Sequence, residues 1–206
     1  MDTWATIRNG REALSDYLAG LAPADWSRPS LCAGWTVKDV AAHMLVIPTM
    51  SKGTVFRSFL GSGFNLEKMN ATFVKRLTAD MSTTDITVAT RASAGSRSMP
   101  PGLKLPGVLT ELVVHSLDIS EGVDTSFALP VEDYVAALDH LKDVQPVFGS
   151  KKRIAGLTLR ATDTGWSTGS GPTVEGPVHQ LLLAVAGRRS GLDRLSGDGL
   201  AALRDR

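Results

Sequence analysis

The chain has a single cysteine, Cys32, among its 206 residues. One cysteine cannot form an internal disulfide, and it excludes a zinc site built from several thiolates. Cys32 lies just before a predicted helix, where two interpretations are open: a reactive thiol near a functional site, or a small buried residue that anchors the loop. We favour the packing role and leave Cys32 out of the predicted chemistry.

Long hydrophobic runs and an excess of one charge are also lacking. No apolar run approaches the roughly 18 residues of a membrane-spanning helix, and the amino terminus lacks the basic-then-apolar pattern of a secretory signal. The formal net charge of +1 gives no electrostatic indication of nucleic acid or an anionic membrane as a partner. We therefore expect a cytoplasmic protein, a monomer or homodimer, whose partners are small molecules.

Glycine-rich nucleotide motifs are absent as well. The sequence contains no G-x-G-x-x-G, Walker or G-x-S-x-G motif and no repeated period. Its short glycine loops, 61–63 and 169–171, lack both the strand-to-helix context and the lysine of a phosphate-binding loop. With 43% apolar and 21% charged residues, the chain has the composition of an ordinary globular protein that can bury a core.

The most informative stretch that is present runs from Leu109 to Ile119 and is typical of a buried helix. At about 3.6 residues per turn, Glu111, His115 and Asp118 fall on one stripe, so two carboxylates and an imidazole point the same way out of apolar surroundings. Burying these groups without partners would be costly. A divalent metal shared by Glu111 and His115, with Asp118 holding the imidazole from behind, would stabilise them.

A third candidate ligand, His43, lies on an earlier predicted helix. Thr36 as N-cap and Asp39 as the N3 residue form a capping-box variant, which predicts a helix from Thr36 toward Met50. His43 then lies two turns inside this helix, among apolar neighbours, and is expected to face inward. Two histidines and one glutamate on facing helices give three protein ligands with an open position, as in catalytic rather than structural zinc sites.

Each part of this pattern also has a simpler interpretation. A lone histidine on an apolar helix face is commonly a core residue with satisfied hydrogen bonds, and a Glu-x3-His pair commonly forms an i,i+4 hydrogen bond. Asp118 has the spacing to cap a neighbouring segment instead of orienting His115. On the residues alone, these alternatives stay open.

Three segments together resemble the mycothiol-dependent maleylpyruvate isomerase family, within the DinB-like metalloenzymes. They are SLCAGWTVKDVAAH (30–43), ELVVHSLDI (111–119) and a carboxy-terminal piece within 156–199 that is similar to the small module of many actinobacterial members. The resemblance implies a four-helix bundle that holds a divalent metal, zinc, through His43, Glu111 and His115. It also implies mycothiol as co-substrate in a transferase or isomerase that acts on a small electrophile.

An acidic substrate would also need a cation. The resemblance implies an arginine from a carboxy-terminal domain that is larger than the module of this chain, so the cation is left open among Lys52, Arg57, Arg91, Arg97, Arg188 and Arg189. Two other functions compete with the thiol-dependent one. They are a metal-dependent hydrolase with the same three ligands, and a bundle that binds a metal or a small ligand without catalysis.

The hydrophobic periods predict a mainly α protein with two domains. Residues 1–148 are expected to form the metal-binding bundle, with helices over 2–20, 36–50, 65–79, from about 82, 107–122 and 130–141. The segment 51–63 is interpreted as a crossover between helices, with a cover over a pocket as the alternative. His140 is expected to be solvated at the polar end of its helix.

Residues 149–206 change from helical periods to alternation. They predict a small α+β module with a two-stranded hairpin, 155–162 and 166–168, followed by a helix over 178–186 and a short terminal helix. His179 opens the apolar helix, where the helix dipole disfavours a charged imidazole, so a capping or surface role is expected.

Overall fold

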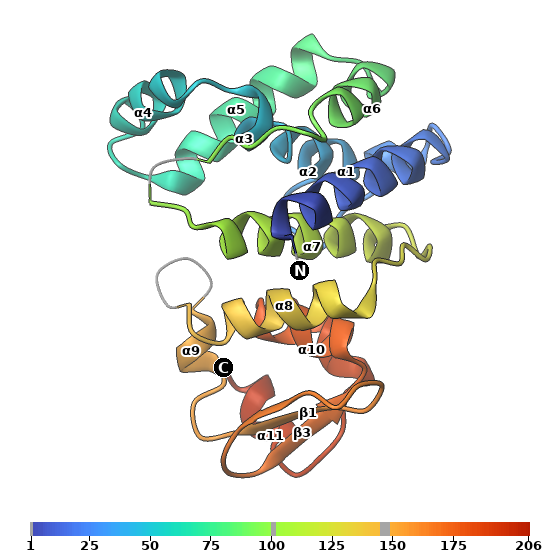
Figure 1. Cartoon of the computed structure of the whole chain (residues 1–206), viewed down its shortest axis with the longest axis vertical. Helices are drawn as coiled ribbons and strands as arrows, with labels where there is room; N and C mark the ends of the chain where they lie inside the picture. Colours follow the sequence, from blue (N-terminus) through green and yellow to red (C-terminus); the bar gives the residue numbers. More distant parts are fainter. Residues whose placement is uncertain (1, 100–101, 145–148) are drawn as a thin grey trace. The chain divides into compact units, whose positions relative to one another are not determined.

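The computed structural model describes residues 2–99, 102–144 and 149–206, and at Lys52 the backbone alone. The chain divides into two compact units between Phe127 and Ala128 (Figure 1). The sequence places this boundary after residue 148. The difference arises because α8 (Val131–Leu141) packs against α10 (Val178–Val185), which gives α8 its partners in the carboxy-terminal unit.

The amino-terminal unit is built from helices around a long central one. Its elements are α1 (Thr3–Ala19), the 3₁₀ helix η1 (Asp25–Ser27), α2 (Val37–His43), α3 (Val46–Thr49), α4 (Lys52–Gly61), α5 (Leu66–Asp80), α6 (Thr83–Ala92) and α7 (Leu105–Gly122). The helix α7 packs against α1 and α2, while α1 also contacts α6 and α2 also contacts α5 (Figure 1).

The central helix α7 is buried along most of its length. Every residue from Gly107 to Ser120 is buried except Glu111, which is half-buried. Polar groups on this helix therefore face protein rather than water, and each needs a partner. Although α7 has 18 residues, none of the described helices combines the length and apolar character required to cross a membrane.

Side-chain caps begin two of these helices where the sequence indicates. Thr36 accepts a hydrogen bond from the backbone N–H of Asp39, and the Asp39 carboxylate accepts one from the backbone N–H of Thr36. Ser82 and Asp85 form the same capping box at α6. Such a cap contributes on the order of 1 kcal/mol. The cap on α2 also fixes the register in which His43 reaches the interior.

The predicted helix 36–50 is in fact two helices. α2 ends at His43, and a turn at Met44 and Leu45 precedes α3. Pro48 explains the interruption, because it has no N–H to donate to the carbonyl of Met44 four residues earlier. His43 is therefore the last residue of its helix, not an interior one.

The segment 51–63 is largely helical, so the predicted crossover is wrong there. Ser51 caps α4 by accepting a hydrogen bond from the backbone N–H of Thr54. Val55 and Phe59 of α4 pack against a buried cluster formed by α3 and α5, and this contact supplies the apolar burial that the interrupted sequence pattern does not show. α7 begins at Leu105, two residues earlier than expected, because Pro106 is tolerated in a first helical turn.

The carboxy-terminal unit combines helices with a small sheet. Its elements are α8, α9 (Ser150–Arg153), β1 (Thr158–Ala161), β2 (Ser167–Gly169), β3 (Thr173–Gly176), α10, the 3₁₀ helix η2 (Arg189–Arg194) and α11 (Leu200–Arg204). β1 pairs antiparallel with β2 and parallel with β3, and α10 packs against β1 and β3. The predicted class, mainly α with a small α+β end, is confirmed. The expected two-stranded hairpin has a third strand, β3.

Gly122 allows the end of α7 to approach the loop before α2. A Cβ at this position would lie 2.7 Å from the carbonyl oxygen of Pro29 and 2.9 Å from Cα of Ser30, both backbone atoms. We expect Gly122→Ala to lower the free energy of unfolding by about 1–3 kcal/mol, because the loop has to move. Urea unfolding measures this, with Gly61→Ala as control, since its Cβ would meet nothing within 4 Å. Equal stability of the two variants would contradict the close approach.

Candidate metal centre

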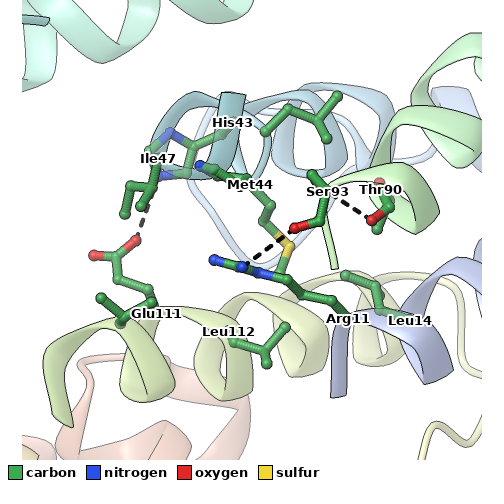
Figure 2. A pocket seen from close by; sticks show the side chains of 12 residues that line it. Arg11, Leu14, His43, Met44, Ile47, Thr90, Ser93, Glu111 and Leu112 are labelled. Atoms are coloured by element: carbon green, nitrogen blue, oxygen red, sulfur yellow. Dashed lines mark hydrogen bonds and ion pairs between the residues drawn. The ribbon is translucent and has the colours of Figure 1, made fainter. Parts of the chain in front are cut away.

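Glu111 and His115 of α7 and His43 of α2 converge in the amino-terminal unit. Oε2 of Glu111 lies 3.4 Å from Nε2 of His115 and 3.6 Å from Nε2 of His43. Figure 2 shows the Glu111 carboxylate directed toward His43 across the space between the two helices. The i,i+4 spacing places Glu111 and His115 on one face of α7, and the packing of α2 on α7 brings His43 to the same place.

The separations between these side chains fit a divalent metal. One donor atom from each residue lies within 4.8 Å of the others. Zinc–ligand bonds of about 2.0–2.2 Å at tetrahedral angles place neighbouring ligand atoms about 3.3–3.6 Å apart. The observed 3.4 and 3.6 Å lie in this range, and both exceed the roughly 2.7–3.2 Å of an ordinary N–H···O hydrogen bond. The donor set therefore suits a shared cation better than direct hydrogen bonding.

Electrostatics keep Glu111 in the form that binds a cation. Burial by itself would raise the pKa of Glu111, but the imidazoles of His115 and His43 outweigh burial and hold that pKa well below its usual range. Glu111 is therefore a carboxylate at neutral pH. A carboxylate and two imidazoles are the donor types that zinc and related divalent metals take in open catalytic sites.

His115 uses both of its ring nitrogens. Nε2 faces Glu111, while Nδ1 lies 2.9 Å from Oδ2 of the fully buried Asp118. Burial by itself would lower the pKa of His115, but hydrogen bonds with Asp118 and Cys32 and the nearby Glu111 carboxylate raise it well above its usual value. The predicted contact between Asp118 and the imidazole is present, on the nitrogen that points away from Glu111. A carboxylate in this position orients a metal-binding histidine in many sites.

Cys32 contacts the same carboxylate, which the packing interpretation did not foresee. Its Sγ donates to Oδ2 of Asp118 at 3.1 Å and lies 3.7 Å from Nδ1 of His115. The backbone N–H of Leu31 donates to the Asp118 carbonyl at 3.1 Å and holds this loop on α7. Cys32, His115 and Asp118 are thus a second group of close donor atoms. In that group, however, the Asp118 carboxylate already accepts the thiol hydrogen bond.

His43 is held differently from His115. Its Nδ1 is buried and has no hydrogen-bond partner among the described residues. The Trp35 ring packs against the imidazole instead, with the ring centroids 5.2 Å apart. The rings of His43 and His115 are nearly perpendicular, with centroids 5.0 Å apart. Packing therefore sets the orientation of His43, whereas a buried carboxylate sets that of His115.

A cleft opens beside Glu111 and His43. The space it encloses is small, about 30 Å³, and its walls are mostly apolar. Three charged or titratable residues are found in the described lining of the cleft: Glu111, His43 and Arg11 of α1. Sequence reasoning missed Arg11, although a signal was available: Arg11 follows Ile7 by four residues and precedes Leu14 by three, and so falls on the apolar stripe of the first helix.

The cations expected from the sequence do not line the described part of this cleft. Arg57 is exposed on α4, Arg91 forms an ion pair with Asp16, and Arg97 packs over the ring of Trp4. Arg188 and Arg189 belong to the carboxy-terminal unit, as do His140 and His179. His140 is half-buried in the last turn of α8, and the His179 ring lies 6.1 Å from that of Tyr134.

Asp118→Asn tests whether the buried carboxylate supports the metal centre. An amide has almost the same shape but accepts the imidazole hydrogen bond without a negative charge, so we expect metal affinity to fall about 10–100-fold with little loss of fold. Competition with a chromophoric chelator measures this affinity. Ser116→Ala is the matched control, because Ser116 is buried on the same helix and, among the described residues, bonds only to the Leu112 carbonyl. Marked destabilisation at unchanged affinity would instead show a purely structural role.

A comparison with protein families agrees with the first of the segments seen in the sequence, 30–43. Residues 7–99 match the family described as mycothiol maleylpyruvate isomerase N-terminal domain. These residues include His43 and end before Glu111, so the match covers one of the three candidate ligands. A comparison with curated proteins found no match.

Two solved structures share the fold. A crystal structure of the mycothiol-dependent maleylpyruvate isomerase aligns with a TM-score of 0.64 at 17% identity, over 96% of this chain and 92% of that chain. A crystal structure of an alanine mutant of the mycothiol-dependent maleylpyruvate isomerase aligns with a TM-score of 0.57 at 18% identity, with the same coverage. This chain and the chains of these structures therefore cover nearly all of one another's length. Within the amino-terminal unit, residues 7–99 thus match the mycothiol maleylpyruvate isomerase N-terminal domain family, which the segment 30–43 resembled in the sequence.

Proposed function

We propose that the protein is a metal-dependent enzyme that uses mycothiol as co-substrate to isomerise, or to transfer the thiol to, a small electrophilic substrate. The observation that carries this proposal is the convergence of His43, Glu111 and His115 beside a cleft with mostly apolar walls. The family of the amino-terminal unit supports the choice of thiol. The partners of the protein are then two small molecules, the thiol and its electrophile.

His43, Glu111 and His115 would hold the metal, and their donor types favour zinc. When bound, a divalent metal lowers the pKa of a thiol in its open position, so that the thiol is present as a nucleophilic thiolate at neutral pH. Glu111 contributes one negative charge and the two imidazoles contribute none, so one positive charge is left to attract the thiolate. Asp118 accepts the Nδ1–H of His115, so that Nε2, directed toward Glu111, is the nitrogen that gives up its proton when a metal binds.

The lining of the cleft favours thiol chemistry over the hydrolase alternative. A hydrolase that activates water at such a site commonly needs a second carboxylate to take the proton from the water. In the described lining of the cleft, Glu111 is the only carboxylate, and it is a candidate ligand. The apolar walls also limit access of water to a reacting thiolate. These features favour a thiol as the nucleophile, since the described lining of the cleft supplies no carboxylate base for water.

Cobalt substitution tests the proposal directly. With cobalt in place of zinc, addition of mycothiol is expected to produce a sulfur-to-metal charge-transfer band, because that transition requires direct coordination of the thiolate. Cys32→Ser is the necessary control, since Sγ of Cys32 lies only 3.7 Å from a ring nitrogen of His115; the band should persist in this variant. An unchanged cobalt spectrum at millimolar mycothiol, together with hydrolysis of simple esters or amides, would replace this function with the hydrolase.

A further inference from the structure

Arg11 is a buried cation without an acidic partner among the described residues. The residue is 6% exposed, and Nη1 donates to the carbonyl oxygens of Ser96 at 2.9 Å and of Ser93 and Ala94 at 3.4 Å. These neutral acceptors hold the guanidinium in place, but they do not neutralise its charge. An unpaired charge in the interior is costly, and proteins normally supply a counterion for it.

The rest of the guanidinium is available to a ligand. An arginine side chain has five N–H donors, and the contacts above use only Nη1. Nε and Nη2 make no hydrogen bond with a described residue. Figure 2 shows the Arg11 side chain extending from α1 into the cleft whose lining includes His43 and Glu111. The free edge of the guanidinium therefore belongs to the same cleft as the candidate metal ligands.

The charge balance of the cleft calls for an anion once a metal is present. Glu111 supplies the only negative charge in the described lining, and a metal bound to Glu111 would neutralise that charge. Arg11 then faces the cleft with no counterion. Carboxylates are the natural complement, because the planar fork of a guanidinium matches their two oxygens in a bidentate pair.

We propose that Arg11 binds a carboxylate of the electrophilic substrate through Nε and Nη2, while Nη1 stays on the carbonyls of residues 93–96. This inference rests on the proposed function and adds to it a specificity-determining residue that selects substrates with an acidic group. Arg11 takes the role that the sequence left open among six other cations. Because the same guanidinium holds residues 93–96, binding of the carboxylate also orders that side of the cleft.

The test uses maleate as probe and maleamide, its neutral diamide, as control, on the full-length, metal-loaded protein without thiol. In ¹H–¹⁵N spectra, maleate is expected to shift the Nε–H resonance of Arg11, assigned by its loss in Arg11→Lys, and maleamide is expected to leave it unchanged. Calorimetry should show about 10–100-fold weaker maleate binding in Arg11→Gln, the loss expected for a charge-assisted hydrogen-bonded pair. Arg91→Gln, which removes an exposed arginine, should bind maleate as the wild type does.

The outcomes distinguish failure of this inference from failure of the proposed function. A metal-loaded protein that gives the mycothiol band but binds maleate without moving the Arg11 resonance would overturn the inference and leave the function intact. Equal maleate affinity in Arg11→Gln and the wild type would overturn it as well. If maleate shifts the Arg11 resonance but mycothiol gives no charge-transfer band, the carboxylate site is supported and the thiol chemistry is refuted. Should Arg11→Gln fail to fold, the wild-type spectrum still decides.

Discussion

Protein purified without chelators or a polyhistidine tag is expected to contain one divalent metal per chain, and His43→Ala and His115→Ala are each expected to lose it. Each variant removes one of three converging donors and leaves two, which is too few to retain the ion through purification. The loss should exceed the roughly 10–100-fold expected for a residue that only orients a ligand. Elemental analysis of the purified proteins measures the metal content.

Histidines of the carboxy-terminal unit provide the matched controls for this experiment. His140→Ala and His179→Ala delete the same chemical group outside the candidate centre and should keep near-equimolar metal. Full retention in both His43→Ala and His115→Ala would refute the ligand set. If His43→Ala kept the metal while Cys32→Ser lost it, the ion would belong to the group formed by Cys32, His115 and Asp118.

Metal affinity is expected to fall by about tenfold per pH unit on acidification below the pKa of His115, or roughly a hundredfold over two units. In the metal-free protein this pKa is raised well above its usual value by Asp118, Cys32 and Glu111. His115 therefore carries a proton at neutral pH, and the proton must leave before Nε2 can bind a metal. The lowered pKa of Glu111 means that its carboxylate adds no proton competition until much lower pH.

Calorimetry in buffers of different ionisation enthalpy counts the protons released on metal binding, and at least one is expected near neutral pH. Asp118→Asn removes the carboxylate that supports the imidazolium, so in this variant the fall in affinity should begin at lower pH.

The free energy of unfolding of the metal-free protein should rise, not fall, as the pH is lowered through the pKa of His115. A group with a raised folded pKa stabilises the fold below its unfolded pKa, and this contribution is lost as the pH rises through the folded value. Metal affinity independent of pH would contradict the assignment of His115.

Local sequence determined the parts of the site that lie within one helix. The 3.6-residue period alone puts Glu111, His115 and Asp118 on one stripe, and the apolar residues around them predict that α7 is buried. The contact between Asp118 and His115 follows from the same i,i+3 geometry. The capping box at Thr36 predicted the start of α2 for an equally local reason, since its partners lie three residues apart.

Contacts between residues far apart in the chain required the tertiary structure. Cys32 and Asp118 are separated by 86 residues, and no sequence period relates them, so the thiol could not be placed against the carboxylate. The short strand β3 is recognisable only by its parallel pairing with β1. α4 is short and begins with Lys52 and Gly53, and its packing against the cluster of α3 and α5 accounts for its place in the fold.

For Arg11, the sequence indicates burial and the tertiary structure shows the surroundings of the side chain. Its position on the apolar stripe of α1 is visible in the sequence, and it indicates burial of the side chain. Which groups surround a buried side chain depends on how α1, α6 and α7 pack, because their crossing brings the carbonyls of residues 93–96 to the guanidinium and opens the cleft beside Glu111. The sequence by itself thus determined which polar residues are buried, while only the packing of helices distant in the chain decided which of them meet.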